Sequence, residues 1–315
     1  MSKSRLMRDA FIDEIYKSAI NDQDIIFISA DFGAAALDDF RENLPDQFIH
    51  AGISEQNMVD VAVGLALTGK KVFLYAMAPF ITTRCYEQTK AVISSMRLPI
   101  TLVAVGVGLG YDHATLTHFT TEDVAIMRAL NGIRLLTPVD SNSAAYIAKE
   151  CINNPKFTYV RLERNPQPDL YGNELESHFD EGYVCLNQGN DIAIISSGCM
   201  THKAIEVRNI LLKNEIDIGV IDVFRIKPLN QSSLPNLLLE YKAILTLEEQ
   251  MLDGGFGGAI LELLADEGIC IPVKRVGIKD NFEVVNGNRE YLNKLYSIDV
   301  ESTVGAVNEL IDKVK

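Results

Sequence analysis

Short apolar runs of the kind that form buried strands alternate with helical patterns along most of this chain. Runs rich in β-branched and aromatic residues occur at 25–30, 71–76, 99–105, 134–136 and 157–162, and again near 191–197, 216–223, 243–248 and 272–277. Helical periodicity fills several of the intervals, for example residues 79–96, 122–131 and 141–152. Such alternation is typical of parallel α/β domains, because each strand returns to its sheet through a helix. We therefore expect an α/β protein.

The alternation lapses between about residues 165 and 190. Pro166, Pro168, several acids and several glycines interrupt both strand and helix patterns there. A chain of 315 residues has room for two domains, each with its own core. The sequence thus predicts two parallel-sheet α/β domains, at residues 1–170 and 190–315, joined by a linker at 171–189.

The composition narrows the class of partner. The net charge of −14 is spread along the chain, and an acidic surface repels nucleic acid. No apolar stretch approaches the roughly 18 residues of a membrane span, so we expect neither a nucleic-acid nor a membrane partner. The charged start, MSKSRLMRDAF, does not resemble a signal peptide. The five cysteines are scattered and form no C-x-x-C pair, which predicts reduced thiols in the cytoplasm and no metal cluster.

A carboxylate opens an apolar helix at Gly-Ile-Ser-Glu-Gln-Asn-Met, residues 52–58. Apolar residues recur at helical spacing after Glu55 until Gly69 ends the pattern. The helix dipole favours the ionised form of an acid in the first turn. Taken alone, Glu55 would be an ordinary first-turn acid.

The segment GISEQNMVDVAVGLALTG resembles the part of transketolases that carries the glutamate activating thiamine diphosphate. Further resemblances to that family, in its own order, are residues 80–88 to its aromatic pyrimidine-pocket helix, Thr117-His118 with residues 121–128 to its Thr-His segment, and residues 191–198 and 227–229 to strands of its last domain. The similarity runs from about residue 5 to the C-terminus. It covers only the second half of the family's sequence.

The resemblance implies a cofactor site for thiamine diphosphate. Glu55 would act as a general acid/base on the cofactor's aminopyrimidine ring. Phe80 would stack on that ring, with Arg84 and Tyr86 in the same pocket. Asp31, just past the first strand, resembles an aspartate near the cofactor. Without the resemblance, the aromatic residues would be assigned to the core and Asp31 to a turn.

Two histidines fall in one loop after the strand at 99–105. Ligand groups of α/β proteins gather at the carboxyl ends of parallel strands, so this loop is a candidate substrate site. His118 matches the family's Thr-His and would move protons on the sugar. The family's Asp four residues earlier is Ala114 here, while Asp112 and His113 come slightly before. His113 also resembles the single histidine of 2-oxo-acid dehydrogenase β subunits, which leaves the donor and the acceptor open.

Two arginines and a glycine run are candidates for phosphate contacts. Arg161 and Arg164 end the strand at 157–162, where the family has a phosphate-binding arginine. Exposed salt bridging is the alternative for both. Residues 254–258 superficially resemble a phosphate cradle but lack the Lys-Ser/Thr of a P-loop. We interpret them as close backbone packing.

The resemblance also shows what this chain does not contain. Transketolases hold Mg²⁺ and the diphosphate with a Gly-Asp-Gly motif and an Asn on another domain, and this sequence has no Gly-Asp-Gly. Mg²⁺ needs hard oxygen ligands, and no credible set occurs here. We expect no metal ligands in this chain. A partner carrying the N-terminal half would supply them, in an assembly with two copies of each subunit.

The first interpretation is one subunit of a split transketolase, an enzyme that moves a two-carbon ketol unit between small sugars, either sugar phosphates or nucleotide-linked sugars. The alternative is a 2-oxo-acid dehydrogenase β subunit or a fragment like deoxyxylulose-phosphate synthase. The run at 80–88 and Thr117-His118 favour transketolase. A third hypothesis is a non-catalytic scaffold, which the presence of both Glu55 and His118 argues against.

Overall fold

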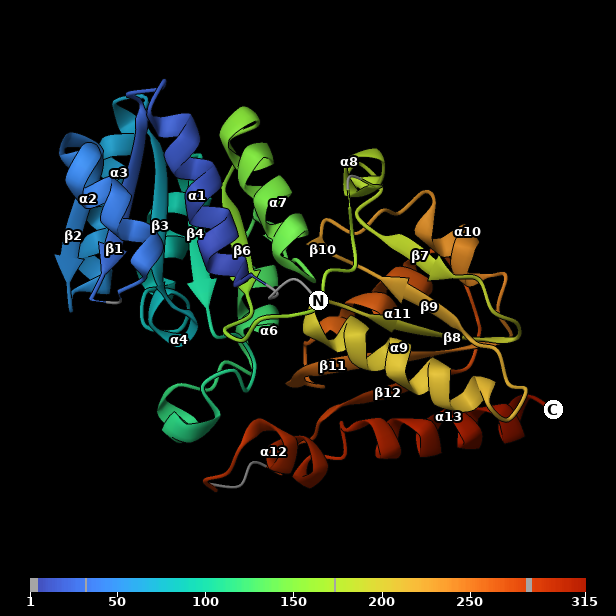
Figure 1. The fold of residues 1–315 in the computed structure, drawn as a ribbon. Coiled ribbons are helices and arrows are strands. Elements are labelled where there is room, and N and C mark those ends of the chain that lie inside the picture. Colours follow the sequence, from blue (N-terminus) through green and yellow to red (C-terminus); the bar gives the residue numbers. More distant parts are fainter. Residues whose placement is uncertain (1–4, 32, 173, 282–284) are drawn as a thin grey trace.

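The computed structural model describes residues 5–31, 33–172, 174–281 and 285–315, which form two α/β domains side by side (Figure 1). A seven-stranded sheet has the order β10-β5-β6-β4-β3-β1-β2, and a five-stranded sheet has the order β12-β11-β8-β9-β7. The two antiparallel pairs are β10 with β5 and β7 with β9, and the other pairs are parallel. The predicted class, two mostly parallel α/β domains, is confirmed.

The first sheet follows the predicted strands closely. Its strands are β1 (Ile25–Ala30), β2 (Phe48–Gly52), β3 (Lys71–Met77), β4 (Ile100–Val105), β5 (Arg134–Leu136), β6 (Thr158–Leu162) and β10 (Arg225–Lys227). Every residue of β1 and β4 is buried, which is why their apolar runs were readable. Alternate residues of β1 face opposite sides of the sheet. As a result, Ile26 and Ile28 belong to one apolar cluster, and Ile25 and Phe27 belong to another.

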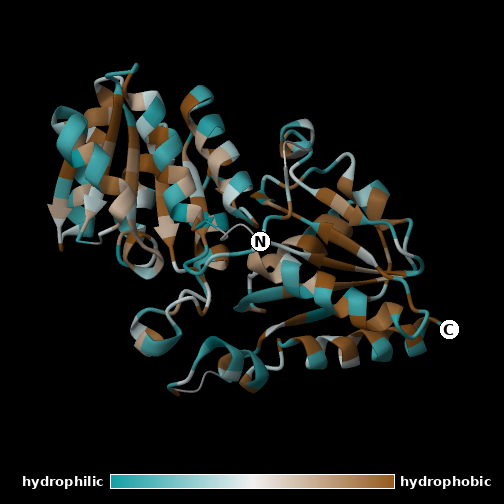
Figure 2. Cartoon of the chain, in the orientation of Figure 1, coloured by the Kyte–Doolittle hydropathy of each residue, from teal (hydrophilic) through white to brown (hydrophobic). Residues whose placement is uncertain are grey.

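Helices cover both faces of this sheet (Figures 1 and 2). The helices of the first domain are α1 (Met7–Ala19), α2 (Asp38–Asn43), α3 (Glu55–Leu67), α4 (Ala78–Ile81), α5 (Tyr86–Gln88), α6 (Asp123–Arg128) and α7 (Ser141–Asn153). The faces of α1 and α7 join the cluster that contains Phe27, whereas α3 packs into the cluster that contains Ile28. The sheet is therefore the middle of three layers.

The second domain repeats the three-layer plan. Its strands are β7 (Val184–Asn187), β8 (Ile192–Ser196), β9 (Gly219–Asp222), β11 (Ala243–Met251) and β12 (Val273–Ile278), and its helices are α9 (Cys199–Leu212), α10 (Leu234–Leu238), α11 (Phe256–Asp266), α12 (Arg289–Leu295) and α13 (Val300–Val314). Helices α9 and α13 pack on one face through a third cluster, which also contains Leu109 and Phe119 of the first domain. Residues of α10 and α11 instead join a cluster that reaches α6 of the first domain, so apolar packing is continuous between the domains.

The structure differs from the predicted elements in three places. The segment predicted as a linker contains α8 (Glu174–His178) and β7, and β7 extends the second sheet. The helix predicted at 79–96 is broken into α4, α5 and a π-helical segment, η3 (Thr89–Ser94). The sequence analysis missed β2, which is only half-buried at the sheet edge. It also assigned residues 227–229 to a strand of the last domain, which is wrong, because β10 ends at Lys227 and pairs with β5 in the first sheet.

Parallel strands bring the candidate residues to one edge of the first sheet. The carboxyl ends of β1, β2, β3, β4 and β6 lead respectively to Asp31, Glu55, Phe80, the loop of residues 106–120 and Arg164. This edge is where α/β sheets bind their ligands. No helix within the described residues has the length and apolarity to cross a membrane.

Candidate active site

Glu55 is the first residue of α3, and its side chain is buried. The side chain is only 5% exposed, and its Oε2 lies 2.7 Å from Nη1 of Arg84. A carboxylate that leaves water needs a charged or hydrogen-bonding partner. Arg84 is that partner, and its own side chain is 40% exposed.

Phe80 presents an aromatic face beside this ion pair. The Cζ atom of Arg84 lies 4.0 Å above the centroid of the Phe80 ring. A flat group bearing N–H donors thus stacks on Phe80 while it donates to Glu55. An aminopyrimidine ring is also flat and also carries nitrogen, so these residues fit the group that the resemblance implies.

The other two predicted cofactor residues lie differently. The Tyr86 hydroxyl donates to the carbonyl of Ile126 at 3.0 Å, which ties α5 to α6. The structure therefore gives Tyr86 a bracing role and does not bring its hydroxyl to Glu55. Asp31 is exposed at the end of β1, where its Oδ1 lies 3.9 Å from Nε2 of His50.

We call residues 106–120 the histidine loop, because it carries His113 and His118. The His118 ring packs edge-on against Phe80, with ring centroids 5.3 Å apart, and against Tyr111 at 5.9 Å. Its Nδ1 lies 2.9 Å from Oγ1 of Thr117. Burial and, secondarily, the nearby charges of His113 and Arg84 lower the pKa of His118 below its usual value. His118 is therefore mostly neutral at pH 7 and able to accept a proton.

Arg164 and Asp112 meet at His113. Nη1 of Arg164 lies 3.2 Å from Nδ1 of His113, and Asp112 Oδ1 lies 3.1 Å from the same nitrogen. That nitrogen accepts from arginine or donates to aspartate, but not both at once. Arg164 also stacks on the Tyr111 ring, 4.8 Å from its centroid. Burial raises the pKa of Asp112, but hydrogen bonds from His113 and the Arg289 backbone outweigh it and leave that pKa lowered.

Arg161 lies away from this group, although sequence analysis proposed it as a substrate residue. Its Nε lies 2.7 Å from Oδ2 of Asp123 and its Nη2 lies 3.2 Å from Oδ1, with both side chains buried. The Tyr159 hydroxyl donates to the same Asp123 at 2.6 Å. Position within the strand separates the two arginines: Arg161 is inside β6, and Arg164 follows it. The Arg161 guanidinium is thus taken up by a buried carboxylate, whereas Arg164 lies beside His113 and Tyr111.

The glycine run encloses one of the protein's own carboxylates. Glu248 accepts the N–H groups of Phe256 at 2.6 Å and Gly257 at 2.8 Å. A Cβ added at Gly255 would lie 2.3 Å from Glu248 Oε2, so only glycine fits there. The interpretation as close backbone packing is confirmed. Burial raises the pKa of Glu248 to about 7, although those two N–H groups oppose the shift.

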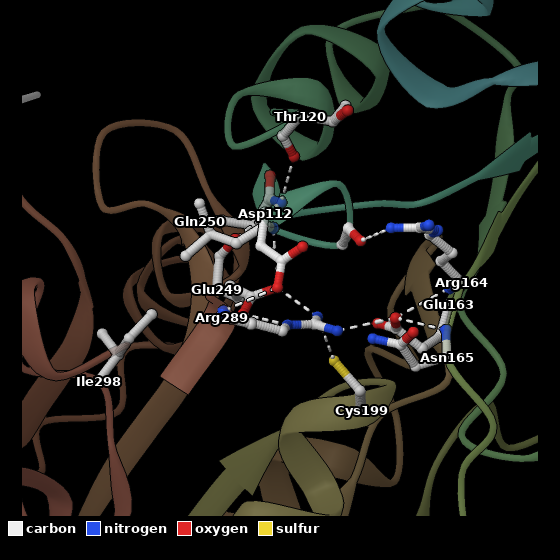
Figure 3. Close-up of polar contacts among 12 residues, drawn as sticks. Asp112, Thr120, Glu163, Arg164, Asn165, Cys199, Glu249, Gln250, Arg289 and Ile298 are labelled. Carbon is white, nitrogen blue, oxygen red and sulfur yellow. Dashed lines mark hydrogen bonds and ion pairs between the residues drawn. The ribbon is translucent and has the colours of Figure 1, made fainter. Parts of the chain in front are cut away.

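Sequence reasoning missed a buried cluster behind the histidine loop (Figure 3). Arg289, at the start of α12, lies between Glu163 and Glu249 and contacts Asp112 through its backbone. Glu249 follows a buried strand pattern, which is a weak signal for a functional acid. Arg289 stands in a short polar helix and had no such signal. Within the described ranges, no three His, Cys, Asp or Glu side chains are arranged to hold a metal ion.

Comparison with known proteins identifies the two domains. Residues 3–168 match the model described as transketolase, pyrimidine binding domain, and residues 182–302 match transketolase, C-terminal domain. One subunit of an apulose-4-phosphate transketolase from Phocaeicola vulgatus is 31% identical over 308 residues, covering 97% of each chain. A 6-deoxy-6-sulfo-D-fructose transketolase subunit from a Clostridium species is 28% identical, covering 98% of this chain and 95% of its own.

A solved structure agrees with these matches. The chain is similar to a split-gene transketolase described as an inactive beta4 tetramer, with a TM-score of 0.88 and 28% identity. The alignment covers 98% of this chain and 99% of that one. Both chains therefore hold the same two domains over nearly their whole length. The chain belongs to the transketolase family and corresponds to the pyrimidine-binding and C-terminal half that split transketolases carry on a separate subunit.

Proposed function

We propose that this chain, together with a subunit carrying the N-terminal half, transfers a two-carbon ketol unit from a ketose to an aldose. The observation that carries the proposal is the grouping of Glu55, Phe80 and His118 at the carboxyl ends of the parallel strands. Phe80 contacts both the Glu55–Arg84 pair and the histidine loop. A group that stacks on Phe80 therefore lies within reach of an acid on one side and a neutral imidazole on the other.

Thiamine diphosphate, when bound, supplies a carbon nucleophile. Glu55 would hold a proton at the ring nitrogen, and Phe80 would carry the face of the ring. Arg84 would release Glu55 as the ring enters, which its 40% exposure makes feasible. We propose that the partner subunit provides the Mg²⁺ ligands and that the assembly holds two copies of each subunit.

His118 would move protons between the sugar's carbonyl and hydroxyl groups. Its lowered pKa leaves the ring neutral at pH 7, so it can take a proton from a hydroxyl and return it later. His113 is more exposed and is engaged with Asp112 and Arg164. We therefore assign proton transfer to His118 and substrate contact to His113 and Asp112.

Arg164 would bind an anionic group on the sugar. The two relatives named above act, by their names, on a phosphorylated and a sulfonated sugar. A guanidinium contacts either anion through two parallel N–H groups. Arg161 is unavailable for this role because Asp123 occupies it. We propose an anionic sugar as substrate and, from the five free cysteines, a cytoplasmic location.

The test is reconstitution. The chain is co-expressed with a candidate partner that contains Gly-Asp-Gly, and thiamine diphosphate binding is measured by calorimetry with and without Mg²⁺. We expect cofactor binding and ketol transfer only in the complex with Mg²⁺, in line with the inactive beta4 tetramer of the related split transketolase. Full turnover by the chain alone would contradict the proposal. Ready turnover of a 2-oxo acid would move the chain to the dehydrogenase class.

A pair of variants tests the histidine assignment in the same complex. His118→Ala is expected to keep cofactor binding and proton exchange at the thiazolium carbon, yet to slow ketol transfer by about 10² or more. His113→Ala is the matched control in the same loop. Normal transfer in His118→Ala beside a collapse in His113→Ala would reverse the two roles.

A further inference from the structure

The Arg289 side chain of the second domain lies partly buried at the interface between the domains, beside the histidine loop. Its Nη1 lies 2.7 Å from Glu163 Oε1, its Nε 2.9 Å from Glu249 Oε1, and its Nη2 3.3 Å from the Cys199 sulfur (Figure 3). Only 17% of the side chain is exposed. The guanidinium therefore joins an acid that follows β6 of the first domain to an acid on β11 of the second.

Each of those acids also fixes part of the candidate substrate site. Glu163 Oε1 accepts the backbone N–H groups of Arg164 at 2.8 Å and Asn165 at 3.0 Å. These bonds set where the Arg164 backbone leaves β6. Arg289 thus reaches the proposed anion-binding arginine through one intervening carboxylate.

Glu249 likewise holds the start of the histidine loop through a backbone hydrogen bond. Its Oε2 accepts the Leu109 N–H at 3.0 Å. A Cβ at Gly108 would lie 2.3 Å from that oxygen, so the loop backbone is pressed against the carboxylate. Burial raises the pKa of Glu249, but Arg289, with smaller contributions from Lys203 and the Leu109 N–H, outweighs burial and leaves that pKa lowered. The carboxylate that holds Leu109 is thus paired directly with the Arg289 guanidinium.

The Arg289 backbone makes the third connection. Its N–H donates to Asp112 Oδ2 at 2.9 Å, while Asp112 Oδ1 accepts the His113 N–H at 2.8 Å. The loop is thus held at Leu109, at Asp112 and, through Glu163, beside Arg164. All three anchors converge on one residue of α12.

We propose that Arg289 is a positioning residue, by which the second domain sets the placement of the histidine loop and Arg164 for the sugar substrate. This inference rests on the proposed function for its consequence in catalysis, but not for the placement of the loop. Arg289 contacts the loop directly at Asp112, and its two carboxylate partners hold Leu109 and Arg164, so its contacts reach beyond the joining of the two domains. The Arg161–Asp123 pair, by contrast, joins two residues of the first domain, where Tyr159 donates to the same carboxylate.

The first experiment measures backbone hydrogen exchange of the full chain, with no cofactor or partner needed. Arg289→Lys keeps the charge, but a single ammonium cannot bind Glu163 and Glu249 in a fork. We expect peptides from residues 106–120 to exchange faster by on the order of tenfold, with β8 unchanged. Arg289→Gln is expected to give a larger effect in the same peptides. If the glutamine variant fails to fold, the lysine variant carries the test.

Arg208→Gln is the matched control, because Arg208 pairs with Asp217 at 2.9 Å entirely within the second domain. It is expected to leave the histidine loop unchanged. Loop exchange equal to wild type in Arg289→Lys would overturn the proposal. Faster exchange throughout α9, α13 and β8 would also overturn it, since that pattern marks general destabilisation.

The second experiment uses the reconstituted complex. Arg289→Lys is expected to raise KM for the sugar by about tenfold or more and to spare proton exchange at the thiazolium carbon, which needs Glu55 and not the loop. Normal KM beside a loosened loop would overturn the catalytic part of the inference. Absence of ketol transfer in the wild-type complex would defeat the proposed function alone, because the exchange experiment still decides whether Arg289 holds the loop.

Discussion

The Glu55–Arg84 pair of the candidate site and the Arg161–Asp123 pair of the interior are arginine–carboxylate pairs in opposite surroundings. At the candidate site, Glu55 is buried, but its partner Arg84 is 40% exposed and stacks on the Phe80 ring. In the interior, Arg161 and Asp123 are 8% and 0% exposed, and Tyr159 completes the set. The comparison teaches that the pair we propose to open for a ligand has one solvated member, whereas the interior pair has none.

The largest expected effect separates these two kinds of pair by chemistry. Glu55→Gln keeps the shape of the side chain but cannot share a proton as a carboxyl can. Turnover in the reconstituted complex is expected to fall by about 10² to 10⁴, with the melting temperature of the chain little changed. Deuterium exchange at the thiazolium carbon is the assay. If this variant exchanges deuterium at the wild-type rate, Glu55 is a structural acid, and its pair with Arg84 does not differ in role from the interior pair.

Asp123→Asn strikes the interior pair instead. Removing the charge leaves the Arg161 guanidinium buried without its counter-ion, which costs about 3–5 kcal/mol of unfolding free energy. Urea unfolding of the chain is the measurement. Little change in the free energy of unfolding would show that the fold does not depend on the Arg161–Asp123 pair, and the contrast with the Glu55–Arg84 pair would be lost.

Asp222 extends the comparison to a buried acid whose hydrogen-bond partners are hydroxyl groups. It accepts hydrogen bonds from Tyr171 and Thr201, each at 2.7 Å, yet burial raises its pKa to about 7. In the unfolded chain the group titrates near pH 4. Between those values the folded protein keeps a proton that the unfolded chain has lost, so this group's contribution is full below about pH 4 and falls as pH rises through 7.

Asp222→Asn is therefore expected to remove part of the decline in stability between pH 4 and 7. Between pH 4 and 7, the unfolding free energy of the wild type is expected to fall by roughly 1 to 3 kcal/mol more than that of the variant. Unfolding free energies measured at several pH values give the result. Parallel curves for the two proteins would mean that Asp222 is ionised in the fold.

The smallest effect is expected at the surface. Lys242 pairs with Asp191 at 2.9 Å, and both side chains are about 60% exposed. Lys242→Gln is expected to change the unfolding free energy by less than about 1 kcal/mol, because water solvates both charges well. This variant calibrates the Asp123 result, and a loss comparable to Asp123→Asn would remove the distinction between exposed and buried pairs.

Sequence patterns predicted what local burial encodes and missed what arises between distant segments. Strands β1 and β4 were readable because nearly every residue is apolar and all are buried. The break after α4 could not be predicted, since residues 79–96 keep a helical pattern although the chain turns there and brings Arg84 over the Phe80 ring. A strand-end pattern could not choose between Arg161 and Arg164, because the choice depends on Asp123, 38 positions away from Arg161.

The candidate site divides in the same manner. Glu55 and His118 were proposed from a resemblance in short segments, and the structure places both beside Phe80 or its partner Arg84. Arg289 reaches the site from 177 positions beyond Asp112, and its pairs are defined by tertiary packing alone. No local signal in a polar helix of seven residues could have pointed to it.

Strand β10 gives the chain a constraint on how it can be divided. It comes from the second half of the sequence, yet it covers the outer side of β5 in the first sheet. A fragment cut near residue 170 would leave the backbone donors and acceptors of β5 open to pairing with another molecule, which is a common route to aggregation. The two domains therefore have to be expressed together. A gene rearrangement that separated them would leave the first sheet without β10.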